Sequence, residues 1–376
     1  MNLDQAFSKT RSKVCIVATG GTIGSCSSST GIAPLSQEDR AIDAIVDRLR
    51  GAGGCGLSGF NELSVEITCP FTLLSENIVP KDWCVIARSI EEAVIRGADA
   101  VVVTHGTDTM AYSLAAISFV MANIQIPVVF TGSMCPAGDP QSDADDNLAG
   151  ALRFSLSACN PGIYLSFPPR DLGNFKVARH KIQSLYWGAR VRSMPTFGDH
   201  FYSIDGRVIA SISDGILCQT SSPPRRAGGS KPFVLDQCID DCFDDRVEII
   251  KVYPGFNPEI LLSAISRKAQ AIILDIYHSG TACARGNERY SIVPAISELG
   301  LAGISVFGVG VPSCRDKQYQ STSALVNCGM IPLGAITLEA AFVKAMWLLG
   351  KGTSSKDLAD QMKNDVCGEF CHVDEH

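Results

Sequence analysis

Short apolar runs alternate with longer amphipathic stretches along the first half of the chain. The runs are rich in Val and Ile and stop at glycine or polar residues, a pattern typical of buried parallel strands. They lie at residues 14–18, 65–68, 100–104, 128–130 and 163–167. The stretches between them have helical periodicity and lie at about 36–50, 80–96, 108–122 and 143–157. This β-α alternation predicts a doubly wound, mostly parallel sheet.

A second, smaller set of alternating elements begins near Val247. Its apolar runs lie at 247–252, 271–276 and 304–309, and its helical stretches lie at about 258–266, 293–299 and 338–349. Residues 219–245 combine Ser, Pro, Arg and Gly with an acidic run, which is linker composition. We therefore predict an N-terminal α/β domain over residues 1–218, a linker over 219–245 and a smaller C-terminal α/β domain over 246–376.

Two segments fall outside the alternation. Residues 201–204 and 208–211 flank the pair Asp205-Gly206, a common hairpin turn, so this region predicts a β-hairpin. Residues 24–31 are rich in serine and have no periodicity, which predicts an irregular, mobile loop.

Composition narrows the class of protein. The 376 residues are 46% hydrophobic, enough for a large core, and the formal net charge is −7, so no overall positive field attracts nucleic acid or an anionic membrane. Residues 1–13 lack the apolar core of a signal peptide, and the longest apolar stretches are too short to span a bilayer. We expect a soluble cytoplasmic protein with neither a membrane nor a nucleic-acid partner.

Cysteine usage agrees with a reducing compartment. Many of the 15 cysteines lie inside apolar patterns, as reduced core cysteines do. Cys238 and Cys242 form one close pair, and Cys367 and Cys371 with His372 form another, but the spacing is loose for a zinc site. We expect neither a metal nor a cofactor.

Hydroxyl residues follow three of the predicted strands. Segment 19–22 reads Thr-Gly-Gly-Thr, segment 104–109 reads Thr-His-Gly-Thr-Asp-Thr, and segment 131–133 reads Thr-Gly-Ser. Each segment alone is typical of a tight turn with a capping threonine. At the ends of parallel strands, the three loops are predicted to converge on one edge of the sheet, which is where ligands of open α/β sheets bind.

The chemistry of these side chains fits acyl transfer from an amide. A threonine hydroxyl becomes a nucleophile when a base takes its proton, and a partly desolvated lysine can act as that base. Backbone N–H groups at glycine turns and helix N-termini can hold an oxyanion. Asp108, at the start of a predicted helix, is either a ligand for an ammonium group or a helix cap. A histidine at a strand end, such as His105, is more often structural, and we give it no role in proton transfer.

Segments 19–23 and 105–110 resemble the two signatures of the bacterial-type L-asparaginase/glutaminase family. Further similar segments lie at 131–134, 142–148, 252–255 and 338–340, and the similarity runs from about residue 12 to residue 350. The chain is most similar to the cytosolic type I branch. The resemblance implies hydrolysis of L-asparagine to L-aspartate and ammonia through a threonine acyl-enzyme. It also implies a homodimer or homotetramer in which a neighbouring subunit helps to close each site.

The resemblance assigns roles by position. Thr22 corresponds to the nucleophile, Thr107 to the second catalytic threonine, and Asp108 to the ligand of the substrate's α-ammonium group. Ser75 corresponds to the residue that contacts the α-carboxylate. The remaining substrate-binding positions are Gly21, Glu76, Gly106 and Ser133. Glu76 stands where many members of the family have glutamine, and a carboxylate there favours the ammonium group.

Two further positions depart from the family's pattern. The loop after the nucleophile usually carries a tyrosine, where this chain has Ile32, so Tyr186 or a residue of a partner subunit would have to replace it. The family's catalytic lysine matches Ala178 without a gap and Lys181 with a short gap. Lys176 is also near, but an odd separation places it and Lys181 on opposite faces of an extended segment. We predict that Lys181 is the catalytic lysine.

Three other functions fit parts of the sequence. A family member that binds an amino acid but hydrolyses it poorly would explain the unmatched lysine and tyrosine. The amidase subunit of an archaeal-type tRNA-dependent amidotransferase shares both signatures, but it would need a further N-terminal domain and a basic surface, and Thr22 lies near the N-terminus of an acidic chain. A nucleotide site is disfavoured because segment 19–22 lacks both the lysine of a P-loop and the glycine spacing of a dinucleotide fingerprint.

Overall fold

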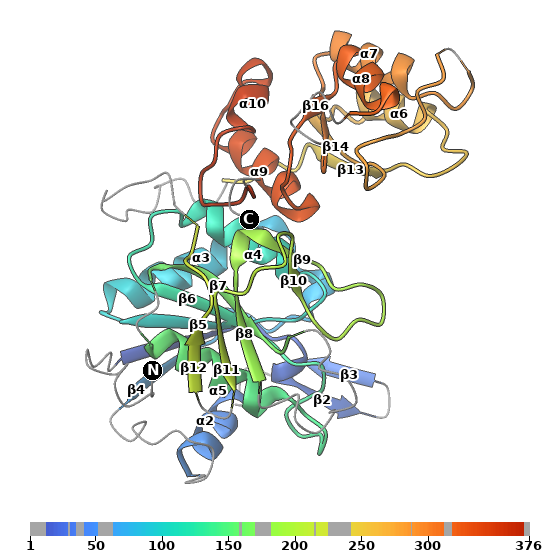
Figure 1. Ribbon diagram of the computed structural model, residues 1–376. Helices are drawn as coiled ribbons and strands as arrows, with labels where there is room; N and C mark the ends of the chain where they lie inside the picture. Colours follow the sequence, from blue (N-terminus) through green and yellow to red (C-terminus); the bar gives the residue numbers. More distant parts are fainter. Residues whose placement is uncertain are drawn as a thin grey trace. The chain divides into compact units, whose positions relative to one another are not determined.

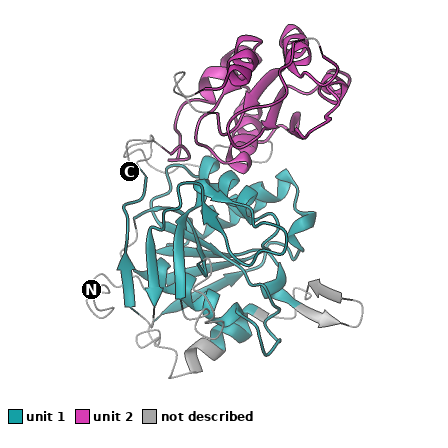
Figure 2. Cartoon of the chain, turned by 45° about the vertical axis from the view of Figure 1, so that its right-hand side comes forward, with its two compact units in different colours: residues 1–240 teal, residues 241–376 magenta. Residues whose placement is uncertain are grey.

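The chain forms two compact units, Met1–Asp240 and Asp241–His376, which are coloured separately in Figure 2. The structure is a computed structural model. It describes residues 13–28, 31–34, 41–51, 63–157, 160–169, 182–213, 216–224, 242–286, 288–311 and 318–371.

Unit 1 is built on an eight-stranded sheet with the strand order β12-β11-β8-β7-β6-β5-β1-β4 (Figure 1). The neighbouring strands β4, β1, β5, β6 and β7 are parallel, whereas β8, β11 and β12 each run antiparallel to the strand before them in the order β7-β8-β11-β12. The strand bounds are β1 (Lys13–Ala18), β4 (Ser64–Thr68), β5 (Ala100–Thr104), β6 (Pro127–Thr131), β7 (Gly162–Phe167), β8 (Ile182–Trp187), β11 (Ala210–Ser213) and β12 (Ile216–Gln219). The predicted mostly parallel α/β sheet is confirmed.

Helices cover both faces of this sheet (Figure 1). They are α2 (Ala41–Gly51), α3 (Pro80–Ile95), α4 (Met110–Val120) and α5 (Ala144–Leu156). Helix α3 begins at a proline, and the Asp82 carboxylate accepts a hydrogen bond of 2.8 Å from the N–H of Val79, which satisfies one backbone donor at the helix start. Helix α4 is buried along most of its length and lies in the core. The predicted start of the α2 helix at Ser36 lies outside the described residues.

The predicted hairpin around Asp205 is wrong, although strands form on both sides of it. β10 (Tyr202–Ser203) pairs with β9 (Val191–Arg192), whereas β11 pairs with β8 and β12. The Asp205 carboxylate accepts hydrogen bonds from Arg190, from the Ser203 hydroxyl and from the N–H of Arg207, and its ion pair with Arg190 is almost fully buried. The Asp205 side chain therefore stabilises this turn without cross-strand pairing, and the flanking strands pair with other strands.

The predicted irregular loop at 24–31 is also partly wrong. β2 (Ser25–Ser28) pairs antiparallel with β3 (Gly31–Pro34), directly after the short 3-10 helix η1 (Thr22–Gly24). Backbone groups alone make such a ladder, so a serine-rich sequence without apolar alternation can form it without a local signal.

Unit 2 is a smaller α/β unit, as predicted, and its sheet is parallel. Its strands follow the order β13 (Val247–Lys251), β14 (Ala271–Asp275), β15 (Ser305–Gly308) and β16 (Ile331–Pro332). Its helices are α6 (Glu259–Ser266), α7 (Val293–Leu301), α8 (Gln320–Asn327), α9 (Leu338–Gly350) and α10 (Ser355–Gln361). The sequence pattern missed the short, polar α8 and α10. Across the described parts of both units, every helix is too short or too polar to cross a membrane.

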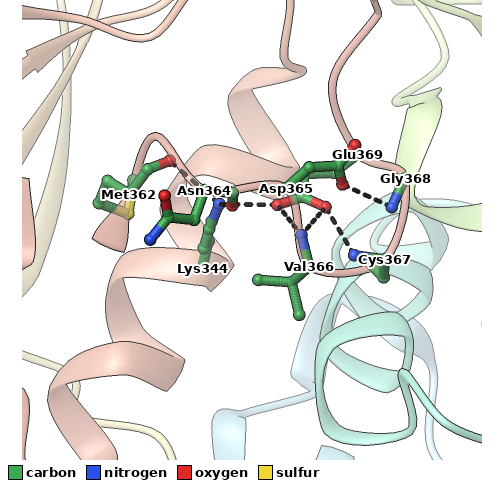
Figure 3. A network of polar contacts seen from close by, with 8 residues as sticks. All are labelled: Lys344, Met362, Asn364, Asp365, Val366, Cys367, Gly368 and Glu369. Atoms are coloured by element: carbon green, nitrogen blue, oxygen red, sulfur yellow. Dashed lines mark hydrogen bonds and ion pairs between the residues drawn. The ribbon is translucent and has the colours of Figure 1, made fainter. Parts of the chain in front are cut away.

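One buried ammonium organises the end of unit 2 (Figure 3). Lys344 of α9 is fully buried, and its Nζ donates to the carbonyl oxygens of Met362 and Asn364 and, at 2.7 Å, to the Glu369 carboxylate. These three acceptors match the three protons of the ammonium group. Residues 362–369 thus form a segment whose oxygen atoms accept the hydrogen bonds of the Lys344 ammonium group.

Two carboxylates share this network. The Glu369 carboxylate accepts from the N–H groups of Val366 and Cys367. Although burial opposes its charge, Lys344, the neighbouring Asp365 and the Cys367 N–H together lower the pKa of Glu369. Burial, followed by the neighbouring Glu369, raises the pKa of the Asp365 carboxyl to about 6. Glu369, which contacts Lys344 directly, is the carboxylate that pairs with the ammonium group at the centre of the network.

The substitution Lys344→Met should destabilise unit 2. Removing one partner of a buried ion pair leaves an uncompensated charge on Glu369, so we expect the free energy of unfolding to fall by about 3–5 kcal/mol, measured by guanidinium unfolding. Lys356→Met, at an exposed lysine of α10, is the matched control and should stay within about 0.5 kcal/mol of the wild type. Adding Glu369→Gln to Lys344→Met should recover part of the loss, and equal losses in the Lys344 and Lys356 variants would contradict the prediction.

Candidate active site

Three parallel strands end at the same level of the unit 1 sheet. In the register, Ala18 of β1 lies opposite Thr104 of β5, and Thr104 lies opposite Thr131 of β6. The segments that begin at Thr19, His105 and Gly132 therefore leave the sheet side by side. The predicted convergence of the three hydroxyl-bearing loops is confirmed.

Backbone hydrogen bonds extend this edge beyond the strands. The N–H and hydroxyl of Thr19 both donate to the carbonyl of Thr104, at 3.1 and 2.8 Å. Leu73 continues the pairing, because its N–H donates to the Thr19 carbonyl and its own carbonyl accepts from Gly21 at 2.8 Å. The segment that contains Ser75 is thereby drawn to the same edge.

Glycine allows these loops to touch. Gly21 has a φ of 74°, which favours glycine, and a Cβ atom built on it would lie 2.3 Å from the nitrogen of Gly106. A Cβ atom on Gly106 would lie 2.4 Å from the Ser75 hydroxyl oxygen. Since Thr22 follows Gly21 and Thr107 follows Gly106, the structure brings both threonines and Ser75 to one place.

The exposure of these residues suits a ligand site. Thr22 and Thr107 are half-buried, whereas Asp108 and Glu76 are exposed at its rim. Ser75 is buried, where it opens the 3-10 helix η3 (Ser75–Asn77). Two hydroxyl groups and two carboxylates therefore lie within reach of solvent at the edge of the sheet.

The start of α4 is tied to the Ser75 segment. The Thr109 hydroxyl donates to the Ser75 carbonyl at 2.8 Å, and α4 begins one residue later at Met110. The positive end of the helix dipole therefore lies next to Asp108, a favourable position for a carboxylate.

His105 is part of a buried chain of hydrogen bonds. Its Nδ1 lies 2.7 Å from the Gly106 carbonyl oxygen, and its Nε2 lies 2.8 Å from the Ser113 hydroxyl, which also accepts from the indole N–H of Trp83 at 3.0 Å. A carbonyl oxygen can only accept, so Nδ1 carries the proton and Nε2 accepts from Ser113. Burial lowers the pKa of His105 to about 4, so its ring is neutral at pH 7. This supports the structural role expected from the sequence.

A second network holds the loop after β6. The Asp143 carboxylate accepts from the N–H groups of Met134 and Cys135, and the Asn147 amide donates to Asp143 and to the Gly132 carbonyl, both at 2.8 Å. Within this loop Ser133 is buried, and its hydroxyl donates to the Cys135 carbonyl at 2.7 Å. The Ser133 hydroxyl thus donates its proton within its own loop, and its oxygen can still accept a hydrogen bond.

The predicted catalytic lysine, Lys181, and its alternatives Lys176 and Ala178 lie outside the described residues. The residue after Lys181, Ile182, opens β8, and Ser184 pairs with Phe167 at the end of β7. β8 therefore begins at the sheet edge that carries the threonine loops.

The possible replacements for the missing tyrosine lie in strands. Ile32 belongs to β3, and Tyr186 lies in β8 opposite Leu165, two residues inward from the pair formed by Ser184 and Phe167. Tyr186 is buried, and burial raises the pKa of its phenol. Tyr186 is therefore a buried residue of the eight-stranded sheet.

Sequence reasoning assigned no role to four of the buried residues that build this edge. These residues are Trp83, Ser113, Asp143 and Asn147. Ser113 is one of two serines in the largely apolar helix α4, so the sequence marks it as a polar residue in a buried stretch but does not reveal its partners. The partner of Trp83 depends on tertiary packing. Within the described ranges, no group of three or more His, Cys, Asp or Glu side chains is arranged to hold a metal ion, and Cys238 and His372 lie outside those ranges.

Comparison with known proteins covers both units. Residues 13–223 match the family model "Asparaginase, N-terminal", and residues 246–362 match "Glutaminase/Asparaginase C-terminal domain". An L-asparaginase of Thermococcus kodakarensis is 32% identical over 363 residues, which span 95% of this chain and 99% of that protein. One of the subunits of the glutamyl-tRNA(Gln) amidotransferase from Methanothermobacter thermautotrophicus is 30% identical over 95% of this chain and 76% of its own length. The solved structure of the thermostable L-asparaginase from Thermococcus kodakarensis superposes with a TM-score of 0.78, at 30% identity, over 96% of this chain and all of that one.

The buried, neutral His105 predicts a specific loss of stability in acid. Its folded-state pKa of about 4 lies below the usual value of 6.5, so the unfolded chain takes up a proton first as the pH falls. The contribution is fully present above pH 6.5 and is lost as the pH falls towards 4. Between pH 7 and pH 4 the wild type should lose about 3 kcal/mol more unfolding free energy than the variant His105→Gln, measured by denaturant unfolding at each pH. Parallel pH profiles for the two proteins would contradict a buried, neutral His105.

Proposed function

Because the chain belongs to the asparaginase family, we propose that it is an L-asparaginase, an amidohydrolase that converts L-asparagine to L-aspartate and ammonia. The contact between Gly21 and Gly106 is the observation that carries this proposal, since it supports a site in which Thr22 and Thr107, the next residues along the chain, lie close together at the carboxyl edge of the sheet. The 32% identity with an L-asparaginase across nearly its whole length supports the choice of substrate.

The proposed reaction proceeds through an ester on Thr22. Its hydroxyl oxygen adds to the side-chain amide carbon of the substrate, the C–N bond breaks, and ammonia leaves with the transferred proton. Water then cleaves the ester, which releases L-aspartate and restores the Thr22 hydroxyl. Backbone N–H groups of the glycine loops around Gly21 and Gly106 are suited to stabilise the oxyanion of both steps.

The remaining residues hold the amino-acid end of the substrate. Asp108 and Glu76 are exposed carboxylates at the rim, and we assign Asp108 to the α-ammonium group, with Glu76 beside it. Ser75 contacts the α-carboxylate in this proposal. Its position against Gly106 supports that role, because it lies next to the backbone that leads to Thr107.

Proton transfer from the threonines is assigned to Lys181, which acts with Thr107. The support is topological, because Lys181 directly precedes β8, and β8 begins at the edge where the threonine loops lie. A lysine beside other polar groups in a partly desolvated site can accept a proton near neutral pH. No cofactor is required for this chemistry. We also infer a homodimer or homotetramer in the cytoplasm, as the family resemblance implies.

The similarity to a glutamyl-tRNA(Gln) amidotransferase supports a second candidate with the same amide chemistry. In that case ammonia would be passed on in a tRNA-dependent reaction instead of being released. Ammonia release from free L-asparagine at the same rate with and without added glutamyl-tRNA(Gln) separates the asparaginase from this candidate. A third candidate, an amino-acid-binding protein with impaired hydrolysis, predicts binding of L-asparagine without ammonia release.

The purified protein should release ammonia from L-asparagine, and faster than from L-glutamine. Thr22→Ala and Thr107→Val should each lower turnover by roughly a hundredfold or more, because the nucleophile or its proton-transfer partner is lost, while Thr22→Ala should still bind substrate. Thr353→Ala is the matched control, because Thr353 is a half-buried threonine of unit 2 whose hydroxyl bonds to Gln361. No ammonia above a no-enzyme blank at several pH values would exclude the hydrolase, and near-normal turnover of a folded Thr22→Ala variant would exclude the nucleophile.

The lysine assignment has its own test. Lys181→Met should abolish most turnover, because the threonine proton then has no base. Lys176→Met should have little effect, because an odd separation from Lys181 would place it on the opposite face if the segment is extended. Initial rates of ammonia release for the two variants give the answer. The reverse result would transfer the role to Lys176, and full activity of both variants would remove lysine from the mechanism at this segment.

A further inference from the structure

We propose that Trp83, Ser113 and His105 form a positioning relay that fixes the peptide joining Gly106 to the catalytic Thr107. The inference rests on the proposed function and adds residues that it does not use. The relay connects helix α3, helix α4 and the end of β5 to one carbonyl oxygen of the site.

The direction of every hydrogen bond in the relay is set by its two ends. The indole of Trp83 can only donate, at 3.0 Å to the Ser113 oxygen, and the Gly106 carbonyl can only accept, at 2.7 Å from His105 Nδ1. The Ser113 hydroxyl, between them, donates its proton to His105 Nε2 at 2.8 Å. One ring tautomer satisfies all three bonds, so the chain of donors ends on Gly106.

The side chains of the relay are buried, and the imidazole ring is packed against a neighbouring strand. Ser113 and His105 are fully buried and Trp83 nearly so. The imidazole also packs against Phe130 of β6, with ring centroids 6.2 Å apart and planes inclined by 49°. Buried polar groups of this kind are costly when unpaired and specify one arrangement when fully paired. His105 is thus neutral, fixed in orientation and shut off from solvent, which suits positioning and not proton exchange with a substrate.

Planarity of the peptide bond transmits this fixation to Thr107. The Gly106 carbonyl and the Thr107 N–H belong to one plane, so holding the oxygen sets the direction of the N–H and the start of the Thr107 backbone. Gly106 cannot hold this plane by itself, because glycine has the widest backbone freedom and has no side chain to pack. The contact of Gly106 with Ser75 requires that absence of a side chain, so the restraint has to come from a neighbour.

Two replacements at His105 separate the bond to Gly106 from the bond to Ser113. The amide nitrogen of asparagine lies as many bonds from Cα as Nδ1, and that of glutamine as many as Nε2. His105→Asn can therefore keep the donor to Gly106, whereas His105→Gln cannot. We expect His105→Gln to lower kcat for L-asparagine by about tenfold or more, with KM changed by less than about threefold, and His105→Asn to recover most of the lost kcat.

Two serines of α4 provide a matched pair. Ser113→Ala removes the donor to Nε2, so the ring is held by its bond to Gly106 alone and is oriented less firmly. We therefore expect kcat to fall part of the way towards that of His105→Gln. Ser118→Ala is the control, because Ser118 is also buried in α4 but donates only to the Leu114 carbonyl of its own helix. Its kcat should stay within about twofold of the wild type at a comparable melting temperature.

Nuclear magnetic resonance tests the relay without relying on catalysis. In protein labelled with ¹⁵N-histidine and ¹⁵N-threonine, the Nδ1 of His105 should carry the proton, and the Thr107 amide signal should move in His105→Gln and Ser113→Ala but little in Ser118→Ala. A wild type that releases no ammonia would reject the proposed function, while these signals would still decide the relay. The relay is rejected if Nε2 carries the proton, if the Thr107 signal moves equally in Ser113→Ala and Ser118→Ala, or if an active enzyme loses the same kcat in both His105 variants.

Discussion

The contact of two glycine backbones governs the geometry of the whole site. Gly21 lies against Gly106, and Gly106 lies against Ser75. A methyl group on either glycine would therefore collide with the neighbouring loop. The sheet makes this contact possible, because its parallel strands end at a common level. The helices that cover the two faces then only have to hold the strands in place. A fold that ended these strands at different levels would separate Thr22 from Thr107.

The sequence revealed the features whose signals are local. Apolar runs predicted the parallel strands, and glycine next to threonine predicted the functional loops, because both depend on neighbouring residues. The pairing around Asp205 was missed because its carboxylate binds Arg190, 15 positions earlier, and so replaces the expected cross-strand pairing. β8 was missed for a related reason: Ile182 follows a segment without a clear apolar pattern, and its partners are set by the sheet.

Two buried titratable groups also show that the local sequence does not reveal the partners of a side chain. His105 and Lys344 are both fully buried, yet His105 is neutral and Lys344 is paired with a carboxylate. The difference lies in the partners, since Ser113 and a carbonyl satisfy a neutral ring, whereas Glu369 balances an ammonium charge. The two side-chain partners, Ser113 and Glu369, lie 8 and 25 positions away in the sequence. No local pattern distinguishes the two cases, although the presence of a polar residue in an apolar stretch marks both.

Close approach and precise orientation place opposite demands on one residue. Gly106 has to be a glycine for the loops to meet, and a glycine leaves the adjoining peptide plane free to rotate. A site that needs Thr107 in one orientation must therefore restrain that plane from outside, and the hydrogen bond from His105 is the restraint that the fold supplies. The same logic explains why the restraint is buried: a ring exposed to water would exchange its bond to Gly106 for one to solvent, and the plane would be free again.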